Sequence, residues 1–120
     1  MEIIMARGDL EVRTFQIRSP SAGGGTEPYT EQLDEIYMTV KRNENDKNFL
    51  FQKRLSDGGI ISKGDGEYEF TIQPEDTDGL AYGSYGFDVE LVKNGAVKKT
   101  FCGELVLTKE YTHRANEGGQ

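Results

Sequence analysis

The amino-acid sequence predicts an all-β fold: a two-sheet, antiparallel β-sandwich of about seven to eight strands with one short helical turn. Apolar and polar residues alternate with a period of two from end to end, because successive side chains of a strand point to opposite faces. No segment shows convincing helical periodicity. Glycine accounts for 15 of the 120 residues, nearly twice its usual share, which indicates many turns between short strands.

The individual strands are predicted from alternating stripes. The clearest strand places Tyr85, Phe87, Val89 and Leu91 on one face. Asn94-Gly95 then predicts a tight hairpin, because both residues tolerate positive φ. The same reasoning predicts a partner strand from about Val97 to Thr108. On this strand, one face carries Val97, Phe101, Gly103, Leu105 and Leu107. Further strands are predicted at 36–41 and 67–72, at a stripe of Phe49, Phe51 and Leu55, and, as short strands, at 3–6 and 60–62.

Several segments interrupt the alternation. The apolar parity changes between residues 10–12 and 15–17, which predicts a β-bulge at Arg13 or Thr14. Glycine, proline and polar clusters predict a long loop at 19–32, a turn at 43–48, a helical turn that begins at Pro74, and a flexible C-terminal tail at 109–120 outside a sandwich at 1–108.

The most specific local pattern consists of Leu80, Gly83 and Tyr85. Here a tyrosine stands at the start of a late strand, directly after a turn. This pattern resembles the tyrosine corner of immunoglobulin-like sandwiches, in which the phenol hydroxyl bonds back to the connecting backbone. The pattern therefore predicts an immunoglobulin-like architecture, without the Cys and Trp markers of antibody domains.

Composition and charge exclude several function classes. Fourteen Lys and Arg against 21 Asp and Glu give a net charge of −7, which disfavours binding to nucleic acid or to an anionic membrane surface. A single cysteine and a single histidine leave no intrachain disulfide and no zinc cluster. Since we also find no signal peptide and no membrane span, we expect a protein made in the cytoplasm. We expect no cofactor, because the sequence contains no cofactor-binding motif.

Several short motifs carry more than one interpretation. Arg7-Gly8-Asp9 spells an integrin-binding tripeptide, but strand-like residues on both sides favour a turn. The acidic run 75–78 looks like a calcium loop, yet it lacks the spacing of an EF-hand, so we favour solvated turn acids. Gly23-Gly24-Gly25 lacks the Lys-Ser or Lys-Thr of a phosphate loop and is interpreted as a flexible loop.

The sequence offers no catalytic constellation. His113 lies in the polar tail without a partner to orient it, and Cys102 has the outward parity of its strand. Glu67 and Glu69 share one face of a strand, where a charged outer surface explains them better than a glycosidase pair. We therefore expect a protein that is not an enzyme and has no small-molecule substrate.

Three tyrosines are candidates for a binding surface, since tyrosine is enriched in interfaces. Tyr29 and Tyr82 lie near loops, and Tyr37 has the outward parity of its strand. They are candidates for contact with a partner protein or with a glycan, and isolated surface aromatics are an equally good interpretation. A carbohydrate-binding β-sandwich module is accordingly the alternative functional hypothesis.

Five segments together resemble small phage and prophage structural proteins, whose immunoglobulin-like domain is similar to the N-terminal domain of siphophage baseplate upper proteins. The resemblance covers about residues 7–108 and implies a virion, tail or baseplate component that docks to other phage structural proteins or to itself, without catalysis. Such a module, made in the cytoplasm and assembled into the virion, should present an uncovered strand edge. The segments are Arg7-Gly8-Asp9, 34–41, 50–58, 72–80 with its Pro-Glu-Asp-Thr-x-Gly-Leu run, and 83–91.

Overall fold

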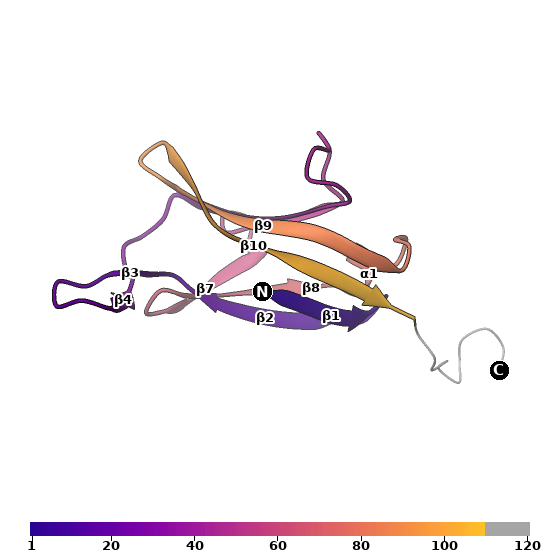
Figure 1. Ribbon diagram of the computed structural model, residues 1–120, viewed down its shortest axis with the longest axis horizontal. Helices are drawn as coiled ribbons and strands as arrows, with labels where there is room; N and C mark the ends of the chain where they lie inside the picture. Colours follow the sequence, from indigo (N-terminus) through magenta and orange to yellow (C-terminus); the bar gives the residue numbers. More distant parts are fainter. Residues whose placement is uncertain (110–120) are drawn as a thin grey trace.

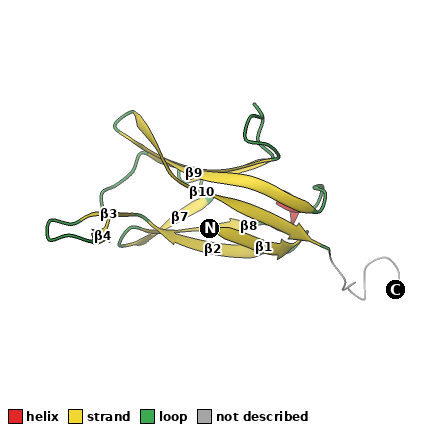
Figure 2. Cartoon of the chain, in the orientation of Figure 1, coloured by secondary structure: helices red, strands yellow, loops and turns green. Residues whose placement is uncertain are grey.

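The structure is a computed structural model that describes residues 1–109, apart from the side chains of residues 99 and 100. The described part contains ten strands and one short helix, which confirms the all-β sandwich with one helical turn (Figures 1 and 2). In chain order these are β1 (Glu2–Ala6), β2 (Glu11–Gln16), β3 (Arg18–Pro20), β4 (Thr26–Pro28), β5 (Glu35–Lys41), β6 (Phe51–Arg54), β7 (Ile60–Gly64), β8 (Glu67–Ile72), α1 (Pro74–Thr77), β9 (Gly83–Lys93) and β10 (Ala96–Thr108).

The strands form two main sheets, which Figure 1 shows as two layers. One has five strands in the order β1-β10-β9-β5-β6, and the other has three in the order β2-β8-β7. The expectation of a purely antiparallel sandwich is wrong at one place, because β1 pairs with β10 in parallel. This pairing places the first strand of the chain beside the last one, so it depends on contacts between residues far apart in the sequence.

The hydrophobic core lies between the two sheets and is built from their alternating inward faces. Phe15 of β2 stacks on Tyr68 of β8, with ring centroids 5.7 Å apart, and meets Phe101 of β10 edge to face at 5.6 Å. These contacts tie the two layers together, since Phe101 belongs to the opposite sheet. The most deeply buried large side chains are Phe70, Ile3, Ile36, Met38, Ile60, Ile72, Leu105 and Leu107.

Two predicted turns form as their local chemistry requires. Asn94 and Gly95 have φ of 52° and 80°, as a tight hairpin between β9 and β10 demands. At α1, Pro74 occupies the start of the helix, and a carboxylate oxygen of Asp76 accepts a hydrogen bond from the Gln73 amide at 2.7 Å. Both predictions are confirmed.

The predicted bulge in β2 is wrong. β2 pairs with β8 without interruption from Glu11 to Gln16, so the parity of its side chains never changes. The apolar Leu10 and Val12 instead point outward and are 56% and 45% exposed. The change in apolar parity between residues 10–12 and 15–17 therefore reflects exposed apolar side chains and not a bulge. The prediction failed because it assumed that all apolar residues point inward.

Three further expectations need correction. Val97 is 63% exposed, because a register shift between Lys99 and Phe101 moves it to the other face from Phe101. Phe49 is 50% exposed and precedes β6, so it does not join the inward stripe. The segment 19–32 is not a loop throughout, since β3 and β4 form a hairpin in it.

The C-terminal tail predicted at 109–120, with His113, lies outside the described residues except for residue 109.

Candidate functional site

Leu80, Gly83 and Tyr85, the residues of the predicted tyrosine corner, stabilise the fold at the start of β9. Tyr85 is 5% exposed, and its hydroxyl donates to the carbonyl of Ala81 at 2.6 Å, which is the backward bond that the motif describes. Leu80 packs against the core, and Gly83 has φ of 132°, which favours glycine. These residues fix the entry into β9.

The structure does not bring the three candidate tyrosines together. Tyr29 follows β4 at one end of the long axis, and Tyr82 precedes β9 near α1 at the other end (Figure 1). Tyr37 lies on the outward face of β5, where the guanidinium of Arg54 is 5.1 Å from its ring centroid. The three residues therefore do not form one binding surface.

The Arg7-Gly8-Asp9 tripeptide is a turn anchored to the helix region. The Gly8 amide donates to the hydroxyl of Thr77 at 2.9 Å, and Thr77 is fully buried. Arg7 donates to the carbonyl of Leu80 at 3.3 Å and lies 4.4 Å above the ring of Tyr82. The arginine is thus engaged within the fold, and the turn interpretation is confirmed.

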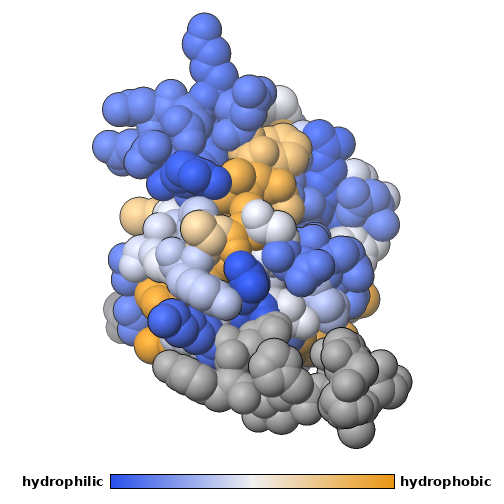
Figure 3. Space-filling model, turned by 90° about the vertical axis from the view of Figure 1, so that its right-hand side faces the viewer, coloured by the Kyte–Doolittle hydropathy of each residue, from blue (hydrophilic) through white to orange (hydrophobic). Residues whose placement is uncertain are grey.

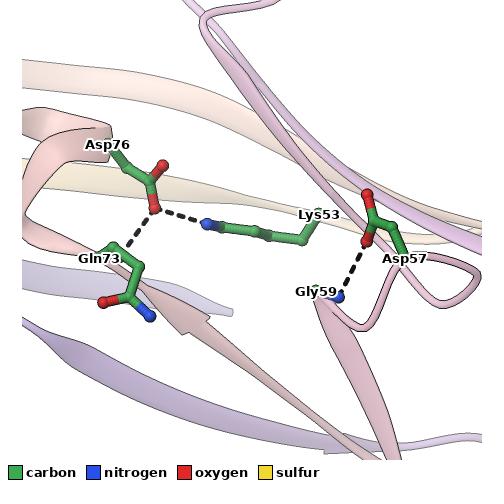
Figure 4. Close-up of polar contacts among 5 residues, drawn as sticks. All are labelled: Lys53, Asp57, Gly59, Gln73 and Asp76. Carbon is green, nitrogen blue, oxygen red and sulfur yellow. Dashed lines mark hydrogen bonds and ion pairs between the residues drawn. The ribbon is translucent and has the colours of Figure 1, made fainter.

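The acidic run of α1 also makes structural contacts (Figure 4). A carboxylate oxygen of Asp76 lies 2.6 Å from the ammonium of Lys53 on β6. Both side chains are largely buried, at 16% and 14% exposed. In the turn after β6, Asp57 accepts a hydrogen bond from the Gly59 amide at 2.9 Å. Among the described residues, no group of three or more His, Cys, Asp or Glu side chains is arranged to hold a metal ion.

The remaining sequence candidates lie on separate surfaces. Cys102 is exposed, as its outward parity predicts. Gly24 and Gly25 lie at the turn between β3 and β4, both with positive φ. Glu67 and Glu69 lie on β8 of the three-stranded sheet.

A shallow groove on the outer face of the five-stranded sheet is a feature that sequence reasoning missed. It encloses about 570 Å³ above β5, β9 and β10, and the segment 44–49 forms one wall. Gly86 hollows its floor, because this outward position on β9 has no side chain. Gln52 donates to the hydroxyl of Thr39 at 2.9 Å across that floor. The exposed Phe49, predicted to lie inward, belongs to this wall.

The exposed strand edges are the other surface on which a β-sandwich can bind partners. Three of the four edges of the two main sheets carry protective features. On β6, Lys53 is held by Asp76. On β7, the register shifts between Ser62 and Gly64. On β2, Arg13 forms an ion pair with Glu11. Charges and bulges of this kind discourage pairing with another strand.

The β1 edge differs from these three. Its sequence, Glu-Ile-Ile-Met-Ala, has one charge, at its first position, and no proline. Its pairing with β10 runs in register from residue 2 to residue 6. The carbonyl of Met1 accepts from Glu104 and the amide of Arg7 donates to Thr108, both at 3.1 Å, so odd-numbered residues bond to β10. By the alternation of a parallel ladder, Glu2 and Ile4 direct their backbone groups to the open edge.

Exposed apolar side chains gather in the same part of the chain. Eight large apolar residues are exposed in the described structure, and four of them, Met1, Ile4, Leu10 and Val12, lie within the first twelve residues. On the end face seen in Figure 3, apolar residues form a narrow strip and separate spots among hydrophilic ones. Of the four exposed residues near the N-terminus, Met1 and Ile4 lie beside the backbone groups of the β1 edge, whereas Val12 lies on β2 of the other sheet.

Comparison with known proteins gives only distant likenesses, all of them to solved structures. No protein-family model matches the chain, and no curated protein matches its sequence. Among solved structures, the endo-β-1,4-mannanase from Thermotoga petrophila is similar to 91% of this chain, with 15% sequence identity and a TM-score of 0.49. The chain spans 18% of the length of that mannanase. At this identity and TM-score, the likeness supports no statement about function.

No helix in the described part of the chain is both long and apolar enough to cross a membrane.

Proposed function

We propose that this protein is a non-catalytic β-sandwich module that docks to a partner protein by adding a strand of that partner along β1. The observation that carries the proposal is the unprotected β1 edge, where Glu2 and Ile4 offer unpaired backbone groups beside an apolar side chain that is 56% exposed. An added strand would satisfy these groups, which is how β-augmentation supplies affinity.

The identity of the partner rests on the sequence resemblance to phage and prophage structural proteins. On that basis the added strand belongs to another structural protein of the virion, tail or baseplate. Self-association of this chain is the competing outcome, and the test below separates the two. A module that binds through backbone pairing places few demands on side-chain chemistry, which suits a chain without a recognisable catalytic motif.

Two of the carboxylates are engaged within the fold and are not suited to act as general acids. Glu35 accepts hydrogen bonds from the amides of Ile36 at 3.1 Å and Ser56 at 2.9 Å. Burial acts to raise the pKa of Glu35, but bonds from Ser56, Ile36 and Leu55 outweigh it and lower the pKa below its ordinary value of 4.5. A general acid requires the opposite shift, and Asp76 is engaged by Lys53.

The alternative hypothesis, a carbohydrate-binding module built on Tyr29, Tyr37 and Tyr82, has less support. These three residues lie at separate places on the molecule, whereas a sugar-binding face needs its aromatic rings within reach of one ligand.

A pair of matched substitutions tests the docking proposal. Ile4→Lys places a charge on the β1 edge, and Ile61→Lys places the same charge on the β7 edge, where the native residue is 52% exposed. The chain is co-expressed with each product of the genes next to its own, and complexes are measured by size-exclusion chromatography with light scattering. We expect a 1:1 complex that Ile4→Lys abolishes and Ile61→Lys preserves.

Two results would count against the proposal. If the wild-type chain forms no complex with any of these gene products, the assignment to a phage partner fails. If it instead forms a homodimer sensitive to Ile4→Lys, the edge is correct but the occupant is a second copy. Equal effects of the two substitutions would show that β1 is not the docking edge.

A further inference from the structure

A pocket of about 430 Å³ opens at the end of the sandwich that carries the β3–β4 hairpin. The connection 29–33 between β4 and β5 forms one wall, and the turn 64–66 between β7 and β8 forms another. Leu55 and Tyr68 complete the lining. This pocket is distant in the chain from the β1 edge, so what it binds is independent of the docking proposal.

Tyr68 gives the pocket a polar group that the fold itself does not use. The residue is 94% buried, since only 6% of it is exposed, and its ring stacks on Phe15. Within the described residues its hydroxyl has no hydrogen-bond partner, and none of the side-chain polar atoms is fully buried without one. The hydroxyl therefore reaches the pocket that Tyr68 lines. A solvent-accessible hydroxyl that bonds to no described residue can exchange its water for a ligand.

The pocket walls are held in place by backbone bonds. The Ile17 amide donates to the Gly66 carbonyl, and the Tyr29 amide donates to the Ile17 carbonyl, both at 2.8 Å. Gly66 has φ of 75°, and a Cβ atom there would lie 2.7 Å from the Tyr29 carbonyl oxygen, so only glycine fits this close approach. A preformed wall lowers the entropy that a ligand must overcome on binding.

The lining chemistry limits the ligand class. It contains no Lys or Arg. Its two carboxylates belong to Asp65 and to Glu31, and Glu31 pairs with Lys93 just outside the lining at 3.4 Å. The Asp65 carboxylate, which has no ion-pair partner among the described residues, disfavours phosphate and other anions. Hydroxyl and amide groups of Tyr29, Gln32 and Ser62 both donate and accept hydrogen bonds. Aromatic and leucine surfaces beside these groups suit the apolar face of a ring.

We propose that this end pocket binds a neutral polyhydroxylated ligand, a single sugar unit, through the Tyr68 and Tyr29 hydroxyls. The sugar ring lies against the apolar lining, and its hydroxyl groups exchange hydrogen bonds with the tyrosines and the neighbouring amide and hydroxyl groups. Burial, and secondarily the proximity of Tyr29, raises the pKa of Tyr68 above its ordinary value of 10.0. The phenol thus stays neutral at physiological pH, able both to donate and to accept.

The test is a titration of the isotope-labelled chain, followed by NMR through the amides of Gly64 and Gly66. The probes are glucose, galactose, rhamnose and N-acetylglucosamine, each up to tens of millimolar, with tetramethylammonium and inorganic phosphate as comparators. We expect saturable shifts with at least one sugar. Tyr68→Phe removes only the hydroxyl and should weaken that affinity about 2- to 10-fold, the value of one hydrogen bond.

Two further variants control for nonspecific effects of removing a tyrosine hydroxyl and for loss of folding. Tyr37→Phe removes a hydroxyl on the outer sheet face and should leave the affinity unchanged. If Tyr68→Phe does not fold, as judged by its thermal melt, Tyr29→Phe serves in its place, because Tyr29 is only partly buried. The proposal is overturned if no sugar gives saturable shifts, if tetramethylammonium binds more tightly than every sugar, or if the tyrosine variants bind as the wild type does.

Discussion

Replacement of Gly103 by alanine tests how tightly β1 is seated on β10. Gly103 lies on the core side of β10, and a Cβ atom there would overlap the Met1 carbonyl oxygen and lie 2.6 Å from Cζ of Phe87. The Phe87 ring is buried and cannot move freely. Overpacking of this kind costs about 1–3 kcal/mol. Displacement of Met1 would also break the bond from Glu104, at a cost of about 0.5–1.5 kcal/mol.

The expected total is a loss of about 1.5–4.5 kcal/mol in the free energy of unfolding. For a domain of this size, about 4 °C per kcal/mol gives a fall in Tm of about 6–18 °C. The matched control is Gly86→Ala on β9, where a Cβ atom meets nothing within 4 Å and should change Tm little. Thermal and urea denaturation measure both variants. If Gly103→Ala melts within about 2 °C of Gly86→Ala, the close contact between β1 and β10 is wrong.

Three other tests probe contacts that stabilise the fold. Thr77→Val should cost about 1–3 kcal/mol in unfolding free energy, because it leaves the Gly8 amide without its acceptor, whereas Thr77→Ser keeps the hydroxyl; equal losses would refute this role. A double-mutant cycle of Lys53→Met and Asp76→Asn should give a coupling of about 1–2 kcal/mol, and a coupling near zero would mean that the pair contributes nothing. Because the folded pKa of Glu35 is lowered, its contribution is present above the unfolded pKa and is lost as the pH falls through the folded one. Glu35→Gln should therefore lower Tm at about pH 7 and have a smaller effect at about pH 3; an equal effect at both would contradict the charge-dependent role.

The elements that sequence predicts well are those fixed by local chemistry. Asn94-Gly95 forms its hairpin because both residues accept positive φ, and Pro74 starts α1 because its ring suits the first helical position. In the stripe that begins with Tyr85, Phe87 and Val89 are buried with that tyrosine and Leu91 is partly buried, because the alternation is regular and one face covers the core. In each case the signal lies within a few residues of the element it specifies.

The features that escape sequence reasoning depend on distant partners or on function. The parallel pairing of β1 with β10 joins residues that lie about one hundred positions apart, so no local pattern encodes it. The β3–β4 hairpin is held by Arg18, which donates to the hydroxyl and carbonyl of Thr26, in a segment without apolar alternation. Leu10 and Val12 break the inward pattern because they face outward near the open edges.

The candidate binding sites also combine features that are predictable from local sequence with features that depend on distant partners. The sequence predicted an uncovered edge in general, but which strand provides it depends on the order of the sheets. Tyr29 is one of the three tyrosines predicted from the sequence as candidates for a binding surface. Tyr68, which lines the same end pocket, is not one of them, because it belongs to the inward-facing apolar residues of its strand. A buried tyrosine with a free hydroxyl cannot be distinguished from an ordinary core residue until its surroundings are known.

The docking proposal is tested most directly by amide hydrogen exchange along β1, measured in the isolated chain and in its assembled complex. In the isolated chain, we expect slow exchange at Ile3 and Met5, whose amides bond to β10, and fast exchange at Glu2 and Ile4. Assembly should slow exchange at Glu2 and Ile4 about 10-fold or more. If a complex forms while these two amides still exchange as fast as in the free chain, β1 does not accept the partner strand.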